Sequence, residues 1–209
     1  FAQMWCCAGL MDFYEYEHIP GVDWLGRYCT TELMPKQVGS ASEQLGKKHV
    51  MTETFACCGW DVTPAELKKI AQWQYVNGVN LMCTHLSPYS IRGQRKRDYP
   101  LHYSEHNSWH EKFRHFNDYF SYLGYMLAES ENRVDTLILH PIKTAYLTYD
   151  RRNDWQSIKE LDDSFAPLIE DYGARNIPHH YGDENLMARH ASVENGVMRV
   201  GKCSYRYVV

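Results

Sequence analysis

The chain has 209 residues, a net charge of −4 at neutral pH and 44% hydrophobic residues. This composition is ordinary for a globular protein and excludes a disordered chain. The pI near 6.3 gives no general attraction to phosphate backbones, so we expect no nucleic-acid partner. No apolar run approaches the roughly twenty residues that a membrane span needs, so we expect no membrane partner.

The first part of the chain alternates short apolar runs with longer amphipathic ones, which predicts βα units and a parallel sheet. The expected strands cover Ile19–Leu25, Lys48–Thr52 and Val79–Cys83, and the expected helices cover Pro35–Leu45, Pro64 to Asn77 and Trp109–Leu127. Thr63 and Glu66 have the spacing of a capping box around Pro64, which marks the start of the second helix.

A domain boundary is expected near residue 130, because Ala128 to Arg133 is polar and lacks periodicity. The expected elements after it are a strand over Val134–His140, a helix over Trp155–Tyr172, a strand from Pro178, a helix over Glu184–His190 capped by Asp183, and a hairpin turning at Asn195-Gly196. This order is typical of an open doubly wound α/β domain. The chain starts without Met and ends in a strand-like segment, so we expect both ends to be cut from a longer protein.

Polar side chains stand at the ends of three neighbouring strands: Asp23 with Trp24, then Glu53, then His85. In a parallel barrel the carboxyl ends of the strands form the active-site face. A strand-end Glu paired with a Lys is the structural alternative for Glu53. Three polar positions at successive strand ends favour a functional site.

The segments Thr52 to Trp60, Gly78 to Asn80 and His85 to Gly93 together resemble the last two barrel strands of clan A glycoside hydrolases, most closely the β-galactosidases of family 42. The resemblance implies that residues 1–130 are the C-terminal part of a (β/α)8 TIM barrel. It implies that residues 131–209 are part of a flavodoxin-like, amidotransferase-like α/β domain that supports a homo-oligomer in the full-length protein.

The same resemblance implies roles for particular residues. Glu53 would be the nucleophile of a retaining hydrolase, and Trp60 would be the stacking platform for a sugar. The other implied substrate-binding residues are Asp23, Trp24, His85, Tyr89, Arg92 and Asp98. The acid/base Glu of the family follows an Asn, and no Asn-Glu pair precedes Glu53, so it would lie in a missing N-terminal half.

The expected activity is hydrolysis of a β-galactoside-like substrate, a reaction that requires two carboxyl groups. Arg97-Asp98-Tyr99 stands where family 42 usually has a Glu and a His. The alternatives are therefore an α-L-rhamnosidase-like hydrolase of plant polysaccharide and a non-catalytic carbohydrate-binding or assembly protein on a decayed barrel.

Two further clusters of residues bear on other kinds of site. His102, His106 and His110 recur every four residues, as in a helical zinc site, but Asn107 and Ser108 indicate a loop, so we expect no metal and no cofactor. The basic run from Arg92 to Arg97 contains no aromatic residue, which favours a solvated or substrate-site loop.

The seven cysteines lack CxxC spacing and are expected to be reduced, buried thiols of a cytoplasmic protein.

Overall fold

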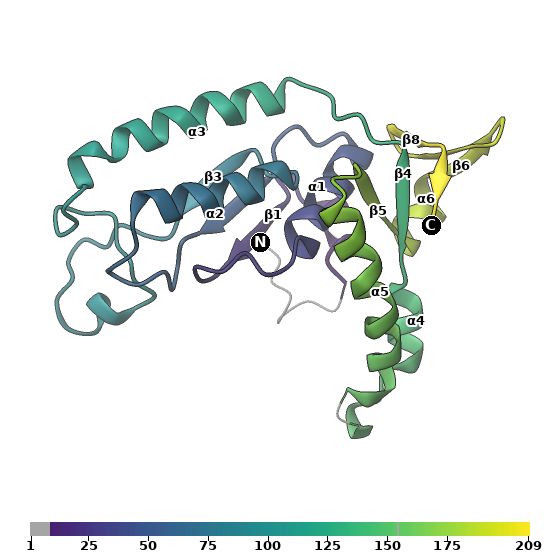
Figure 1. The fold of residues 1–209 in the computed structure, drawn as a ribbon, viewed down its shortest axis with the longest axis horizontal. Coiled ribbons are helices and arrows are strands. Elements are labelled where there is room, and N and C mark those ends of the chain that lie inside the picture. Colours follow the sequence, from purple (N-terminus) through teal and green to yellow (C-terminus); the bar gives the residue numbers. More distant parts are fainter. Residues whose placement is uncertain (1–8, 154) are drawn as a thin grey trace.

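The structure is a computed structural model that describes residues 9–153 and 155–209 (Figure 1). Its first part contains η1 (Phe13–Tyr16), β1 (Gly21–Trp24), α1 (Leu33–Leu45), β2 (Met51–Thr54), α2 (Pro64–Val76), β3 (Leu81–Thr84), η2 (Gly93–Arg97), η3 (His110–Lys112) and α3 (Phe113–Ala128). The three strands pair in parallel in the order β1-β2-β3. The predicted βα units and parallel sheet are confirmed.

Local sequence signals explain the helix ends. Thr63 accepts a hydrogen bond from the Glu66 backbone N–H (3.3 Å), and the Glu66 carboxylate accepts one from the Thr63 N–H (2.9 Å), so the capping box is confirmed. α1 ends at Gly46, whose φ of 69° is left-handed and costs glycine little.

β2 begins later than the sequence indicates. The Asn80 side chain accepts from the Val50 N–H and donates to the Lys48 carbonyl, each at 2.9 Å. Because a side chain occupies these main-chain groups, the strand is assigned only from Met51. β2 also ends later, at Thr54 and not at Thr52, so Glu53 lies inside the strand and not immediately after it, which corrects the expected strand end.

One face of the parallel sheet packs against α2. Thr52 and Thr54 are buried there, and both hydrogen-bond the side-chain amide of Gln74. Trp24 packs against Trp73 of α2 with ring centroids 4.6 Å apart. Since side chains alternate along a strand, the intervening residues point to the opposite face.

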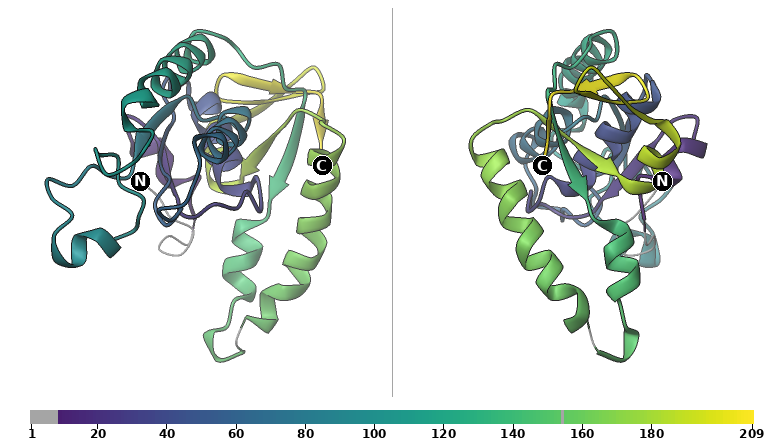
Figure 2. Two further views of the ribbon diagram at one scale, coloured as in Figure 1. Left: turned by 60° about the vertical axis from the view of Figure 1, so that its left-hand side comes forward. Right: turned by 90° about the vertical axis from the view of Figure 1, so that its right-hand side faces the viewer.

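The second part contains β4 (Thr136–His140), α4 (Ile142–Thr148), η4 (Arg151–Asn153), α5 (Gln156–Ala174), β5 (His179–Asp183), α6 (Glu184–His190), β6 (Ala191–Glu194), β7 (Val197–Val200), β8 (Cys203–Tyr205) and β9 (Tyr207–Val208). A parallel sheet has the order β5-β4-β9, and an antiparallel sheet has the order β6-β7-β8. The predicted strands, helices and hairpin are present, whereas α4 was not predicted. α4 and α5 extend together away from the rest of the molecule (Figure 2).

Helix α1 joins the two parts. Its Ser40 hydroxyl accepts a hydrogen bond from the Tyr181 N–H (3.0 Å), and Gln44 Nε2 donates to the Tyr181 carbonyl (2.9 Å). These two side chains hydrogen-bond the backbone N–H and carbonyl of Tyr181 at the outer edge of β5, where no further strand of the described chain pairs with them. Val38, Ile138 and Tyr181 belong to one hydrophobic cluster, so residues on both sides of position 130 share a core. The domain boundary stays a prediction.

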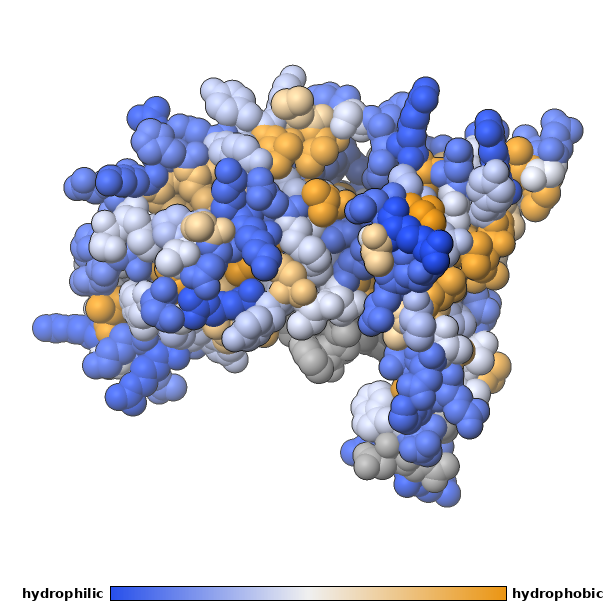
Figure 3. Space-filling model, viewed as in Figure 1, coloured by the Kyte–Doolittle hydropathy of each residue, from blue (hydrophilic) through white to orange (hydrophobic). Residues whose placement is uncertain are grey.

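The mixed α/β class is confirmed. Within the described ranges each sheet has three strands and none closes into a barrel, so the barrel and the flavodoxin-like domain stay predictions. No helix in the described part of the chain is both long and apolar enough to cross a membrane. Hydrophilic residues cover most of the face drawn in Figure 3, with hydrophobic patches beside α3 and near the C-terminal strands.

Candidate functional site

Two carboxylates and a thiol form a row across the parallel sheet. Asp23 is paired in register with Glu53, and Glu53 with Cys83, each at the third position of its strand. All three side chains are partly buried. They lie on the face opposite Trp24, one residue before the carboxyl end of each strand. Parallel strands place such residues together at one edge of the sheet.

Glu53 has an imidazole beside it. Its Oε1 atom lies 3.9 Å from Nε2 of His85, and the two side chains are 21% and 15% exposed. The His85 N–H donates to the carbonyl of Thr54 at 3.0 Å, which fixes the start of the following loop. The His85 ring also meets the Tyr99 ring edge-on at 5.8 Å. The Glu53 carboxylate therefore faces the imidazole of His85, which is held in place by these contacts and is partly shielded from solvent.

The neighbouring thiols are held in the protonated form. Burial raises the pKa of Cys83, and the negative charge of Glu53 raises it further. Burial also raises the pKa of Cys57, with a further contribution from the charge of Asp23. A protonated thiol is a poor nucleophile. The chemistry available on this face therefore belongs to the carboxylates.

Cys57 itself is exposed, contrary to the expectation that the cysteines are buried, and Cys6 and Cys7 lie outside the described residues.

Backbone hydrogen bonds tie together the loops that follow the three strands. The Gly26 N–H donates to the Ala56 carbonyl (2.7 Å), and the Gly59 N–H donates to the Pro100 carbonyl (3.0 Å). Arg27 forms ion pairs with Asp61 and with Glu66, both at 2.9 Å, and its guanidinium lowers the pKa of Asp61. The loops after β1, β2 and β3 thus form one connected edge around Glu53.

The loop directly after β2 has an unusual backbone. Phe55 and Cys57 have φ values of 78° and 62°, in the left-handed region that non-glycine residues rarely adopt. Phe55 is fully buried and packs against Tyr103 and Phe116. This burial supplies the packing that maintains the strained conformation beside Glu53. Strain of this kind concentrates at functional sites.

Trp60 presents an aromatic face on the same edge. Its Nε1 donates to the Lys96 carbonyl (3.1 Å), its ring meets His102 edge-on at 5.3 Å, and the residue is 39% exposed. It lines an open surface hollow of about 630 Å³ together with Ile91, Lys96, Arg97, Pro100 and His106. The Glu53–His85 pair and Trp60 are connected through the loop that carries Tyr99 and Lys96.

The other predicted site residues are placed as follows. Trp24 is only 7% exposed and lies on the helix-covered face, so it is not brought to Glu53. Tyr89 and Arg92 are exposed on the loop after β3, and Asp98 lines a second hollow beside Tyr99. Cys83 was not predicted as part of the site, although the alternation within Val79–Cys83 places it beside Glu53.

The three histidines considered as a metal site do not meet one another. His102 is buried, with Nε2 2.6 Å from the Arg95 carbonyl. Within the part of the chain that the structure describes, no group of three potential ligands includes His102, His106 or His110.

The chain is similar to parts of two known proteins. The chain is 28% identical over 120 residues to a protein of Formosa agariphila described as "Putative beta-glucuronidase", covering 55% of this chain and 10% of that protein. A solved structure of a rhamnosidase from Novosphingobium sp. PP1Y superposes with a TM-score of 0.63 over 95% of this chain and 19% of that chain. At 16% identity this likeness shows the fold alone. The chain therefore spans only a small part of the length of these relatives.

A family match covers the Glu53 segment. Residues 27–153, more than half of the chain, match glycoside hydrolase family 106, described as alpha-L-rhamnosidase. The matched range includes Glu53, Trp60, His85 and the loop after β3. The expected glycoside hydrolase family is thereby confirmed in general terms, but the match is not to the family 42 β-galactosidases. The chain belongs to the alpha-L-rhamnosidase family, glycoside hydrolase family 106.

Proposed function

We propose that this chain is part of a glycoside hydrolase that cleaves α-L-rhamnosides and that Glu53 is one of its two catalytic carboxyl groups. The observation that carries the proposal is the contact between Glu53 and His85 on the sheet face opposite α2, 3.9 Å apart and within the segment that matches the family. Trp60 offers a half-exposed indole to the apolar side of a sugar ring.

The family description supports a rhamnoside over the β-galactoside expected from the motifs around Glu53. The structural neighbour is likewise a rhamnosidase. The resemblance to family 42 supports the general chemistry, because it rests on a strand-borne Glu followed by a Trp seven residues later. The galactoside is thus the weaker proposal for the sugar.

We further propose that residues 1–130 belong to the C-terminal part of a (β/α)8 barrel and residues 131–209 to a flavodoxin-like, amidotransferase-like domain. The consecutive parallel order β1-β2-β3 supports the barrel. Leu81, on the face that carries Glu53, is 38% exposed. In a complete barrel, strands from the rest of the protein would enclose this face.

The proposed chemistry needs a second carboxyl group. In a retaining enzyme it lies about 5 to 5.5 Å from the nucleophile, and in an inverting enzyme it lies about 6.5 to 9.5 Å from the base. We place the acid/base Glu in a part of the protein outside this chain and assign Glu53 as the nucleophile of a retaining reaction. Detection of the first-formed sugar anomer by NMR tests this assignment, since inversion would make Glu53 the base that activates water.

The substrate proposal is tested with the full-length protein that contains this chain. Hydrolysis of 4-nitrophenyl α-L-rhamnoside, β-D-galactoside and β-D-glucuronide is compared under identical conditions. The proposal predicts the highest kcat/KM for the rhamnoside. A higher kcat/KM for the galactoside or the glucuronide would contradict rhamnose as the substrate sugar. Binding of a sugar without any turnover would support the non-catalytic alternative.

A further inference from the structure

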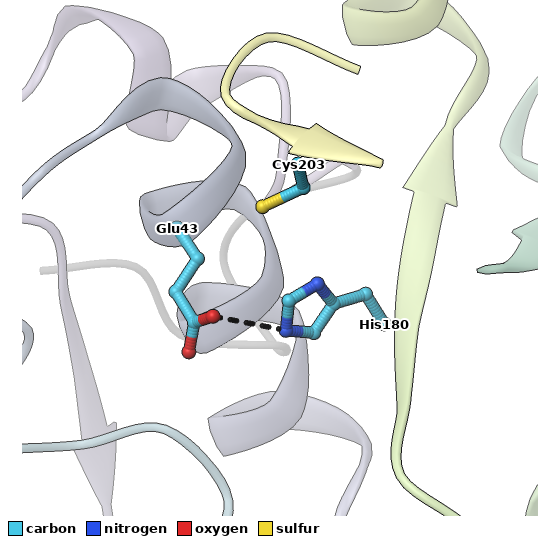
Figure 4. A group of neighbouring side chains, drawn as sticks. All are labelled: Glu43, His180 and Cys203. Carbon is cyan, nitrogen blue, oxygen red and sulfur yellow. Dashed lines mark ion pairs between the residues drawn. The ribbon is translucent and has the colours of Figure 1, made fainter. Parts of the chain in front are cut away.

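Three side chains from distant parts of the sequence converge away from the Glu53 face. Glu43 comes from α1, His180 from β5 and Cys203 from β8, and their side chains point toward one another (Figure 4). One potential ligand atom from each lies within 4.8 Å of the other two. The Glu43 Oε2 and His180 Nε2 atoms are 3.3 Å apart. The sequence gives no motif for this group, because the three residues are separated by 137 and 23 positions.

The surroundings hold these side chains in place. His180 is 3% exposed, and its Nδ1 atom lies 2.8 Å from the Tyr205 hydroxyl, which in turn accepts from Gln44 Nε2 at 3.0 Å. Asn132 Nδ2 donates to the other oxygen of Glu43 at 3.4 Å. A hydrogen bond at Nδ1 fixes the orientation of the ring and therefore the direction of Nε2. Histidines that bind metals through one ring nitrogen commonly form such a hydrogen bond through the other.

We propose that Glu43, His180 and Cys203 bind a divalent cation of the zinc type, with water at the fourth position. A carboxylate, an imidazole and a thiolate form a donor set that Zn²⁺ accepts in tetrahedral geometry. Magnesium and calcium require oxygen ligands, so nitrogen and sulfur donors disfavour them.

The position of the group indicates a structural role for the cation. α1 packs on β5, and β8 belongs to the antiparallel sheet. A bound cation would therefore join α1 to both later sheets, at the place where Gln44 and Ser40 already connect α1 to Tyr181. Binding only to the folded form raises the free energy of unfolding with the logarithm of the cation concentration, once that concentration exceeds the dissociation constant.

The test uses the full-length protein, freed of metal with a chelator and titrated with Zn²⁺ or Co²⁺. The proposal predicts a thiolate-to-cobalt charge-transfer absorption band and a rise of the unfolding temperature with Zn²⁺. Cys203→Ser should remove the band and weaken the Zn²⁺ affinity at this site by roughly 100-fold or more. The matched control is Cys29→Ser, which replaces a partly buried thiol outside the group and should keep both signals.

The outcomes are separable from those of the substrate test. A native protein without a thiolate-to-cobalt band would overturn the proposal, as would a band that survives Cys203→Ser. If Cys203→Ser does not fold, Glu43→Gln provides the second variant, and an undiminished Zn²⁺ affinity in it would also contradict the site. Zinc bound through the histidines of the loop after β3 would persist in both variants and be lost in His106→Ala, which would likewise count against Glu43, His180 and Cys203.

Discussion

Glu53 of β2 and His85, which directly follows β3, lie side by side near the carboxyl ends of the parallel strands. Glu53 Oε1 is 3.9 Å from His85 Nε2. His85 is itself held by its backbone hydrogen bond to Thr54 and by ring contact with Tyr99. Small displacements of a reacting carboxylate are costly to catalysis. We therefore treat His85 as a positioning residue for Glu53.

Replacing His85 with Gln should lower kcat by up to about 100-fold in the full-length enzyme, with a much smaller change in KM, because the carboxylate loses its neighbour while the sugar contacts remain. Steady-state kinetics on an aryl α-L-rhamnoside measures this split. His115→Gln, at an exposed position of α3, is the control and should leave both constants unchanged. Unchanged kcat in His85→Gln would remove the positioning role.

Trp60→Ala should raise KM by roughly fivefold, since a stacked aromatic contact is worth about 1 kcal/mol. Stability should change little, because the residue is 39% exposed. Trp155→Ala is the matched control, as Trp155 is 61% exposed and contacts Tyr149 with tilted rings 5.1 Å apart, on the segment before α5. If Trp60→Ala leaves KM at the native value, Trp60 is not a sugar platform.

Gly39→Ala tests the packing of α1 against the turn between α2 and β3. An added Cβ would meet the Asn77 carbonyl oxygen and the Gly78 Cα atom, both at 2.8 Å, and these are backbone atoms that cannot rotate away. We expect a loss of about 1 to 3 kcal/mol of unfolding free energy, measured by chemical denaturation. Gly173→Ala in α5 faces only the Glu32 side chain at 3.3 Å. It should be neutral or stabilising by up to about 1 kcal/mol, and equal destabilisation by both would contradict the packing argument.

Much of the fold could be predicted because its signals are local. The Thr63–Glu66 capping box, Gly46 after α1 and the Asn195-Gly196 turn each fix an element end through neighbouring residues. The start of β2 could not be predicted, because the Asn80 side chain, thirty residues from Val50, takes its backbone N–H. The role of α1 was equally hidden, since Ser40 and Gln44 meet Tyr181 only after folding.

The site was predicted in part for the same reason. Strand alternation and parallel pairing place Asp23 beside Glu53, and the sequence shows both residues at comparable strand positions. Trp24, one residue later, necessarily points to the opposite face, so grouping it with Asp23 ignored the two-residue period. The contact of His85 with Tyr99 depends on the path of a long loop, and no local pattern specifies that path.

Acid should weaken the fold through His140. Burial lowers the pKa of His140 below its ordinary value of 6.5, against the opposing charges of Asp183 and Glu184. Above pH 6.5 the His140 side chain is neutral in both the folded and the unfolded protein, and its contribution to stability is fully present. As pH falls from 6.5 toward the folded pKa, the unfolded chain binds a proton that the folded form resists, so stability declines.

His140→Gln removes this titration and should flatten the dependence of unfolding temperature on pH below 6.5. His18→Gln, at an exposed position, is the control and should retain the native slope. A native slope in His140→Gln would show that other groups account for the acid sensitivity.

The central claim is that the Glu53 carboxylate takes part directly in glycoside cleavage. The most direct measurement is kcat/KM of full-length Glu53→Gln on an aryl α-L-rhamnoside, beside Glu131→Gln at an exposed position of the segment after α3. We predict a fall of roughly 100- to 10,000-fold for Glu53→Gln and a native value for Glu131→Gln. Native kcat/KM in a folded Glu53→Gln protein would contradict the assignment of Glu53.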